Sequence, residues 1–276
     1  MLTICALFYG DHAALAARCL GGLDDNLAAG RPFIGDIRLG LNEVSRGVTD
    51  YILGWAEEAA IRHSLPILVY RPDCNAFKYP LMRRMIHGEV HGHPLGDLVM
   101  WQDDDAHLEQ GFDWKHMLDF MARQDMIGHI YYWYVQGAQA EWVKRQPWHD
   151  PRVDGTETRN GRPVFLFAQG SWWVIRSEIL QRYDWPIREL KHNGGDALLG
   201  ELFRQQGLRL ANYSHRVRVN ADEEGRDSKA KRRGFSELPL GVNLAASFNK
   251  DLSYHNFAVN LRVFTVDGWS ETSLQT

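Results

Sequence analysis

The sequence predicts an α/β fold: one Rossmann-like, mostly parallel sheet with helices on its faces. Two observations predict this class. Short apolar runs alternate with longer segments of helical periodicity over the first hundred residues, as in successive βα units. Each apolar run stops at a polar or turn-forming residue, where a buried strand would end. The length of 276 residues and the 45% hydrophobic content suit one large domain with a sizeable core.

The expected elements can be assigned in chain order. Strands are expected over 2–9, 36–41, 66–70, 98–101, 127–135, 164–168 and, as one or two strands, 208–219. Helices are expected over 12–27, 48–63, 77–87, 113–124, 177–183 and 195–206, with Ser177 as the N-cap of the fifth. The polar segment 141–162, which contains two prolines, is expected to form a loop. No internal repeat separates these elements, so we expect one domain over 1–240 and a C-terminal extension over 241–276.

Charge and cysteine content exclude several classes of protein. The net charge of −4 provides no global basic field for nucleic acid or anionic membrane, so only a local patch could bind either. Three cysteines without a CxxC pair argue against a disulfide framework and favour a reducing, cytoplasmic setting. The N-terminus lacks the basic region of a signal peptide, and no apolar run is long enough for a membrane span.

Three consecutive aspartates, Asp103 to Asp105, follow the expected fourth strand. Like charges this close repel, and a divalent cation such as Mg²⁺ or Mn²⁺ offsets that repulsion while binding phosphate oxygens. In an extended segment Asp103 and Asp105 share one face, whereas Asp104 points away. Because ligands bind at the carboxyl ends of parallel strands, this position favours a site. An acidic loop or an exposed helix N-terminus would also explain the triplet.

Two later residues are candidates for proton transfer and metal binding. Asp196 follows two glycines at a helix start, where a carboxylate could act as a general base; a plain N-cap is the alternative. His215 follows an expected strand and could bind Mn²⁺, although the chain has 12 histidines and most must be structural or exposed. Basic residues between Arg226 and Arg233 could neutralise a diphosphate or form a solvated loop, and Lys78 and Arg83 have the same two interpretations.

In this order the motifs resemble the GT-A glycosyltransferases, particularly the inverting family-2 type, over roughly residues 1–240. The first strand ends near Asp11, the third in Arg71-Pro72-Asp73, and the fourth enters Asp103-Asp104-Asp105. Gly195-Asp196 stands at the catalytic-base position, where the family carries Glu before Asp. A histidine follows, and then Arg232-Arg233-Gly234-Phe235, a variant of the family's Arg-Trp signature with Phe in place of Trp.

The resemblance implies a role for each matching position. Residues 1–112 would hold a nucleotide-sugar, with UDP as the expected nucleotide, and residues 113–240 the acceptor. Asp105, Asp103 and His215 would hold Mn²⁺ or Mg²⁺, and Asp196 would be the catalytic base of an inverting displacement. The implied contacts with the nucleotide-sugar are Tyr9, Asp11, Asp73, Lys78, Arg83, Asp103, Asp104, Arg232 and Arg233.

The acceptor is less well defined by the sequence. Aromatic residues in the second half of the chain stack on sugars and nucleobases alike, or fill a core. The candidates for acceptor contact are Trp133, Gly170, Ser171 and Trp172. Compact enzymes of this type in bacteriophages glycosylate hydroxymethylated pyrimidines in DNA, so that acceptor is expected first, a saccharide or lipid-linked acceptor second. A non-catalytic nucleotide-sugar-binding module is the alternative from another class.

Overall fold

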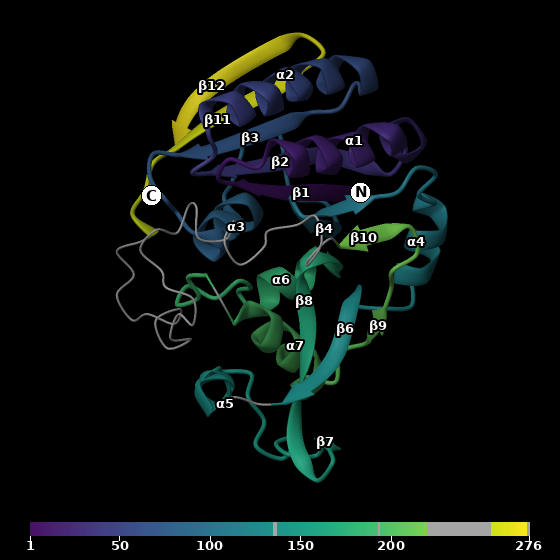
Figure 1. Ribbon diagram of the computed structural model, residues 1–276, viewed down its shortest axis with the longest axis vertical. Helices are drawn as coiled ribbons and strands as arrows, with labels where there is room; N and C mark the ends of the chain where they lie inside the picture. The colour runs from purple at the N-terminus through teal and green to yellow at the C-terminus, as the bar shows by residue number, and fades with distance from the viewer. Residues whose placement is uncertain (135–136, 193, 220–254, 275–276) are drawn as a thin grey trace.

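The computed structural model describes residues 1–134, 137–192, 194–219 and 255–274 (Figure 1). The helices are α1 (Ala13–Gly30), α2 (Arg46–His63), α3 (Lys78–His87), α4 (Trp114–Met121), α5 (Gly137–Lys144), α6 (Ser177–Arg182) and α7 (Gly195–Gln205). The first strands are β1 (Leu2–Tyr9), β2 (Ile34–Asn42), β3 (Ile67–Pro72), β4 (Leu98–Asp103), β5 (Ala106–Leu108) and β6 (Met126–Tyr134). The remaining strands are β7 (Thr158–Arg159), β8 (Arg162–Arg176), β9 (Leu210–Asn212), β10 (Val217–Val219), β11 (Val259–Thr265) and β12 (Gly268–Leu274).

One large sheet organises the chain in the order β12-β11-β3-β2-β1-β4-β8-β6-β9, with β7 paired to β8. The four strands β3, β2, β1 and β4 are parallel neighbours. Strand β8 joins β4 antiparallel, and β6 pairs antiparallel with β8. Strands β5 and β10 form a separate antiparallel pair. The predicted α/β class with a mostly parallel sheet is therefore confirmed.

Helices cover both faces of the sheet because both faces of its central strands are apolar. Along β1, Cys5 and Leu7 belong to one core cluster, which also contains residues of α3, α5, α6 and α7. Ile4, Ala6 and Phe8 belong to the other cluster, with residues of α1, α2 and α4. Alternation along a strand sends successive side chains to opposite faces, so a run that is apolar throughout is buried on both.

Two local expectations were wrong. The segment 141–162 is not a loop throughout: it contains the second half of α5 and all of β7. The N-cap of α6 is Arg176 rather than Ser177, and among the described residues no side chain caps this helix. The Ser177 hydroxyl donates instead to the backbone oxygen of Asp97.

The C-terminal hairpin β11–β12 extends the sheet at its edge. Strand β11 pairs antiparallel with β3, and β12 pairs with β11. Figure 1 shows this hairpin at one end of the sheet and the long antiparallel strands β6 and β8 projecting at the other. Within the described parts of the chain, none of the helices is long and apolar enough to cross a membrane.

Candidate functional site

The carboxyl ends of the parallel strands bring the polar strand-end residues to one edge of the sheet. Residue pairing places Tyr9 beside Asn42, and Leu7 beside Asp103. The Asp104 carboxylate is buried and accepts a hydrogen bond of 3.1 Å from the backbone N–H of Tyr9, while its own N–H donates to Leu7. Strand β4 ends at Asp103, and Asp104 and Asp105 lie in the turn that follows, so the alternation expected of an extended segment does not reach Asp105. Asp104 and Tyr9 thus fix the path of the triplet.

A second set of contacts ties the segment before α3 to the same edge. The Asn42 side chain donates to Asn75 (3.0 Å) and accepts from the backbone N–H of Ala76 (2.9 Å). Asn75 also accepts from the N–H of Phe77, which stands at φ 58° directly before α3. A positive φ is costly for a bulky residue, so these amide contacts stabilise the turn that delivers Lys78 to the site.

Lys78 and Trp101 hold the carboxylate of Asp103. The Lys78 ammonium lies 2.6 Å from Oδ2 of Asp103, and the Trp101 indole N–H donates to Oδ1 at 2.9 Å. Trp101 is two residues before Asp103 on β4, so their side chains share one face of the strand. The ion pair is largely buried, with 15% and 12% of the two side chains exposed. Both oxygens of Asp103 are therefore oriented before any ligand arrives.

Gly170 and Asp196 complete this cluster from two further elements. Lys78 also donates to the backbone oxygen of Gly170 at 3.0 Å. A Cβ added to Gly170 would lie 2.7 Å from Oδ1 of Asp196 and 3.0 Å from the Lys78 nitrogen. Residues from α3, β4, β8 and α7 thus meet at one point, although Lys78 and Gly170 are 92 positions apart.

The surroundings of Asp196 favour its protonated form. Burial raises the pKa of this carboxyl, and the charge of Asp103 raises it further. The Lys78 charge and a hydrogen bond from the Gly170 backbone act against that rise in the pKa. A carboxylate is a more effective general base when its pKa is moved towards the working pH, so this environment suits the base role expected of Asp196.

Tyr79 supports the start of α7 and was not predicted from the sequence. Its ring is 4% exposed, and a Cβ on Gly195 would overlap the Tyr79 hydroxyl at 2.0 Å. Burial raises the pKa of Tyr79, as do the charges of Asp196 and Asp103, whereas a hydrogen bond from the Gly195 backbone lowers it. Because Gly195 has no side chain, the start of α7 can pack directly against Tyr79, and this packing positions Asp196. A Gly-Gly-Asp sequence signals such an approach, but nothing in the sequence names Tyr79 as the neighbour.

Gly170→Ala is expected to impair activity while preserving the fold. The new methyl group must displace the Asp196 carboxylate or the Lys78 ammonium, and a displacement of about 1 Å at a reacting group can cost on the order of 100-fold in rate. The check is nucleotide release from a nucleotide-sugar, the ligand that the sequence resemblance implies, with thermal unfolding of the variant measured in parallel. Gly54→Ala is the matched control, because an added Cβ there meets no atom of the described residues within 4 Å. Equal turnover by both variants would contradict this arrangement.

Several predicted residues are not brought to the cluster. The Arg83 guanidinium donates to the backbone oxygens of Asp184 and Pro186 and forms an ion pair of 2.6 Å with the Asp184 carboxylate. Arg83 thus anchors the segment between α6 and α7. Asp11, which is exposed, accepts from Ser45 at 2.7 Å, and Asp73 is exposed at the end of β3. These two remain at the same edge of the sheet without a described contact to Lys78 or Asp196.

His215 lies at the far end of the β5–β10 pair from the triplet. Val219 pairs with Ala106, next to Asp105, whereas Arg216 contacts Glu109 and Gln110. The exposed His215 ring packs at 5.1 Å against His116 of α4. Among the residues that the structure describes, no group of three or more His, Cys, Asp or Glu could hold a metal. Arg232 and Arg233 lie outside the described residues.

The expected acceptor residues divide into exposed and buried ones. Trp133 on β6 is 53% exposed, and Gly170 and Ser171 are partly buried on β8. The expectation that Trp172 contacts the acceptor was wrong. Its side chain is 1% exposed and stacks on Tyr213 inside the core, so it cannot reach an acceptor. Trp142 and Trp148, in the segment that was expected to form a loop, are also buried. Strand β8 is covered on both faces there, which buries Trp172 and Trp173 alike.

Trp172→Ala is expected to destabilise the fold by about 3–5 kcal/mol, the usual cost of removing a buried tryptophan. Trp133→Ala, on an exposed strand position, is expected to change stability by no more than about 0.5 kcal/mol. Urea unfolding of both variants beside the parent chain gives the two differences. Similar losses of stability for both would mean that one of these burial assignments is wrong.

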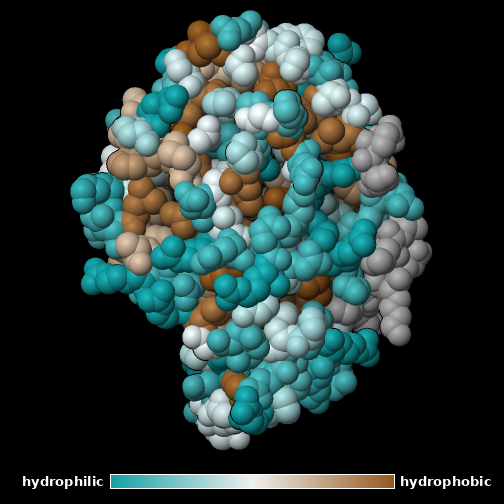
Figure 2. Space-filling model, turned by 180° about the vertical axis from the view of Figure 1, so that it is seen from behind, coloured by the Kyte–Doolittle hydropathy of each residue, from teal (hydrophilic) through white to brown (hydrophobic). Residues whose placement is uncertain are grey.

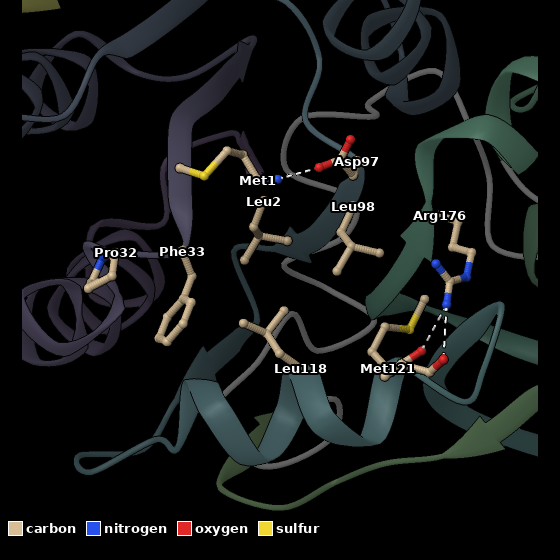
Figure 3. A pocket seen from close by; sticks show the side chains of 10 residues that line it. Met1, Leu2, Pro32, Phe33, Asp97, Leu98, Leu118, Met121 and Arg176 are labelled. Carbon is tan, nitrogen blue, oxygen red and sulfur yellow. Dashed lines mark hydrogen bonds and ion pairs between the residues drawn. The ribbon is translucent and has the colours of Figure 1, made fainter.

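A hollow at the opposite edge of the sheet is not part of this cluster. Figure 3 shows it at the amino ends of β1 and β4, where the Met1 amino group pairs with Asp97. Its volume is about 350 Å³, and Leu2, Leu98 and Met121 contribute to its lining. Ligands of open α/β sheets bind at the carboxyl ends of the strands, which favours the edge with Asp103 over this hollow.

The comparisons with known proteins give the fold class. No protein-family model and no curated protein sequence matches the chain. Among solved structures it is similar to a mannosyltransferase from Pyrobaculum calidifontis in complex with GDP-Man and Mn²⁺. The TM-score is 0.50 at 12% identity, over 77% of this chain and 54% of that one. Residues 1–349 of TarS from S. aureus give a TM-score of 0.47 at 13% identity, over 77% and 58% of the two chains.

A nucleoside-diphosphate-sugar pyrophosphorylase from Vibrio cholerae RC9 gives a TM-score of 0.43 at 8% identity, over 78% of this chain and 95% of that one. The chain spans 54% and 58% of the lengths of the mannosyltransferase and the TarS fragment. At 12% identity the similarity to the mannosyltransferase concerns the fold alone, and this fold is of the GT-A type. The fold class expected from the order of the motifs is thereby confirmed.

Proposed function

We propose that this chain is a metal-dependent glycosyltransferase that moves a hexose from a UDP-sugar to an acceptor hydroxyl with inversion. The observation that carries the proposal is the convergence of Lys78, Asp103, Gly170 and Asp196 from four elements at the carboxyl edge of a GT-A sheet. A similar fold holds GDP-Man and Mn²⁺ in the Pyrobaculum mannosyltransferase, which supports a nucleotide-sugar and Mn²⁺ as the ligands sought here.

The carboxylates of the triplet fit a Mn²⁺ or Mg²⁺ ion that also binds a diphosphate. Such ions often take only one or two protein carboxylates, and phosphate and water oxygens fill the remaining positions. Asp105 would be the main ligand, as the resemblance implies. Asp104 would hold the path of the segment through the Tyr9 backbone, and Asp103 is held by Lys78 and Trp101. His215 is not included in this proposed metal site. The ion would stabilise the negative charge that develops on the departing diphosphate.

The protein's own residues would then divide the work of a single displacement. Asp103, fixed by Trp101 and Lys78, would accept a hydrogen bond from the ribose. The oxygen of the acceptor hydroxyl would bond to the anomeric carbon while the bond between that carbon and the nucleoside diphosphate breaks. Asp196 would take the proton that this hydroxyl loses. Lys78 would place a positive charge near the leaving group. Residues 1–112 would hold the donor and residues 113–240 the acceptor.

We propose a hydroxymethylated pyrimidine in DNA as the acceptor, with a saccharide or lipid-linked acceptor as the alternative. A base must leave the stack before its hydroxyl can reach a site such as Asp196. The test is to incubate the protein, Mn²⁺ and labelled UDP-glucose with hydroxymethylcytosine DNA and with unmodified DNA of the same sequence. Label on the modified DNA alone is expected. Equal, negligible label on both, with nucleotide still released from the donor, would reject the DNA acceptor and keep the glycosyltransferase.

Release of nucleoside diphosphate also separates an enzyme from a binding module. A glycosyltransferase with Mn²⁺ is expected to hydrolyse its donor slowly even without acceptor. Nucleotide binding without any release, across a panel of nucleotide-sugars with and without metal, would favour the non-catalytic module.

A further inference from the structure

Strand β6 carries a row of exposed aromatic rings. Three consecutive rings on β6 are exposed: Tyr131 (38%), Tyr132 (41%) and Trp133 (53%). They lie on the outer part of β6, which projects with β8 from the body of the molecule (Figure 1). Large rings are usually buried, so adjacent exposed ones indicate a contact surface. Alternation along the strand puts Tyr131 and Trp133 on one face and Tyr132 on the other.

The face with Tyr131 begins beside Asp196. Tyr131 pairs across the strands with Phe167 and stacks on its ring, with centroids 5.4 Å apart. Phe167 lies three residues before Gly170 on β8, and a Cβ added to Gly170 would lie 2.7 Å from Oδ1 of Asp196. Burial raises the pKa of Tyr131, and the charge of Asp196 adds to that rise. Trp133 lies about 7 Å further out, since a strand advances by about 3.4 Å per residue. The two rings therefore form a path leading away from the candidate base.

Two arginines from the tip of the β7–β8 hairpin lie near the outer end of this path, Arg159 over Trp133 and Arg162 over the next ring of β6, Tyr134. The Arg159 guanidinium lies 5.8 Å from the Trp133 ring centre, and that of Arg162 lies 4.9 Å from the Tyr134 ring centre. The turn between them, Asn160-Gly161, has φ values of 52° and 70°, as a tight two-residue hairpin turn requires. This turn directs both arginines back over β6.

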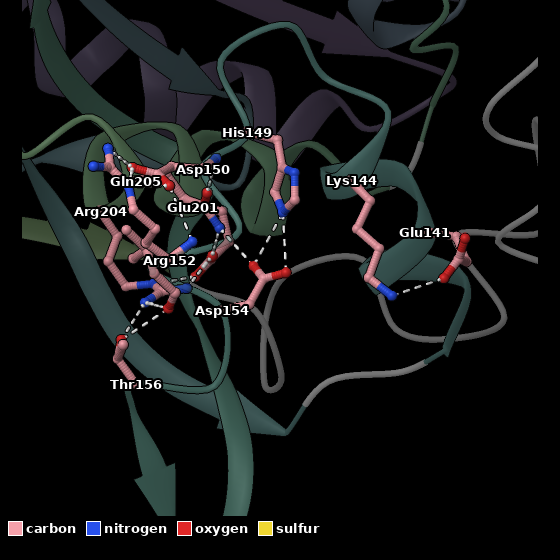
Figure 4. Close-up of polar contacts among 11 residues, drawn as sticks. Glu141, Lys144, His149, Asp150, Arg152, Asp154, Thr156, Glu201, Arg204 and Gln205 are labelled. Carbon is pink, nitrogen blue, oxygen red and sulfur yellow. Dashed lines mark hydrogen bonds and ion pairs between the residues drawn. The ribbon is translucent and has the colours of Figure 1, made fainter.

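These arginines differ from the other basic residues around them. Figure 4 shows Lys144 paired with Glu141, Arg152 with Asp150 and Arg204 with Glu201. Neither Arg159 nor Arg162 forms an ion pair with any residue that the structure describes. Both are exposed, and Figure 2 shows the projecting part as mainly hydrophilic when seen from behind. The tip thus presents two guanidinium charges that form no ion pair within the described part of the chain, beside rings on which a ligand could stack.

We propose that Tyr131, Trp133, Arg159 and Arg162 form a binding surface for single-stranded DNA, the β6 surface, which leads the strand to Gly170 and Asp196. Bases would stack on the two rings, and the arginines would contact phosphates. A neutral glycan could stack on the rings but would leave both guanidinium charges without a counter-charge. This inference rests on the proposed function only where it assigns the bound DNA as the sugar acceptor. Binding of DNA to the β6 surface does not require sugar transfer.

The test is fluorescence anisotropy with a short labelled oligothymidine, over a series of salt concentrations. The parent chain is expected to bind, and Trp133→Ala to weaken binding about 5- to 150-fold, which corresponds to about 1–3 kcal/mol per stacked base. Arg159→Gln and Arg162→Gln should each make the salt dependence shallower, by about 0.7 in the log–log slope.

Trp269→Ala is the matched control. Trp269 is also 53% exposed and also lies under an arginine, Arg262, at 4.9 Å. It belongs to β12 at the other end of the sheet, and Arg262 is neutralised by Glu271. Binding by Trp269→Ala should equal that of the parent chain, and thermal unfolding should show that both tryptophan variants are folded.

Two results would overturn the β6 surface as a DNA site. One is equal binding by Trp133→Ala, Trp269→Ala and the parent chain. The other is no oligothymidine binding by the parent chain, with or without binding of a neutral glucan oligosaccharide in its place. Nucleotide release from UDP-sugar by the parent chain is measured separately. Release without DNA binding would reject this inference alone, whereas DNA binding without release would reject the proposed function alone.

Discussion

Asp196→Asn is expected to lower kcat for sugar transfer by about 10²–10⁴-fold, the usual contribution of a positioned general base. The amide has nearly the same shape but cannot take the proton of the acceptor hydroxyl. The affinity for nucleoside diphosphate should change little, because in our proposal the diphosphate contacts Lys78 and the metal. Single-turnover transfer and calorimetric binding of UDP with Mn²⁺ measure the two quantities.

The pH dependence of transfer gives an independent check on Asp196. Burial and the Asp103 charge raise the pKa of this carboxyl, so it becomes an available base only at a higher pH than an ordinary aspartate. The rate of transfer should therefore rise with pH, with an apparent pKa above the usual range for Asp. The residual activity of Asp196→Asn should lack this rise. Asp119→Asn, at an exposed carboxylate paired with Lys115, is the control. Near-normal turnover by Asp196→Asn would remove it from the base role.

Asp105→Asn is expected to abolish the stimulation of donor hydrolysis by Mn²⁺. A bound metal contributes several kcal/mol of charge stabilisation, so the loss should be on the order of 100-fold or more. Nucleotide release over a Mn²⁺ titration measures it. Mn²⁺ with UDP should also raise the Tm of the parent chain but not that of Asp105→Asn.

The neighbouring residue gives a contrast for this second prediction. Asp104→Ala leaves the buried N–H of Tyr9 without its acceptor, so it should lower the free energy of unfolding by about 1–3 kcal/mol. Its Tm should nevertheless still rise with Mn²⁺ and UDP. A variant Asp105→Asn that kept full metal stimulation would show that Asp105 is not the metal ligand.

The first half of the fold could be predicted because its local signals agree with its tertiary arrangement. Strands β1, β3 and β4 are apolar runs that end at polar residues, and helices α1 and α2 have apolar residues at helical spacing. Strand β8 is longer than predicted because Gln169, Gly170 and Ser171 interrupt its apolar pattern at the site. Helix α5 was missed because it lies at the start of a polar segment, where its packing through Trp142 and Val143 leaves little local signal.

The candidate site could be predicted where it depends on strand ends, and not where it depends on distant elements meeting. Asp103 and Asp104 follow from the rule that ligands bind at carboxyl ends of strands. Lys78 was singled out as a basic residue near the site, but its contacts with Asp103 and Gly170 depend on how α3 packs against β4 and β8. Trp172 was misplaced because a strand covered on both faces has no exposed side, which its sequence alone does not reveal.

The most direct measurement of the central claim is a crystal structure of the protein with UDP and Mn²⁺. We predict the nucleotide at the carboxyl edge of β1 to β4, with the ribose at Asp103, the metal at Asp105 and the diphosphate near Lys78. Asp196 should face the open side where the acceptor hydroxyl would enter. Nucleotide bound elsewhere, for example in the hollow of about 620 Å³ beside Trp148 and Arg182, with the carboxyl edge empty, would contradict the account.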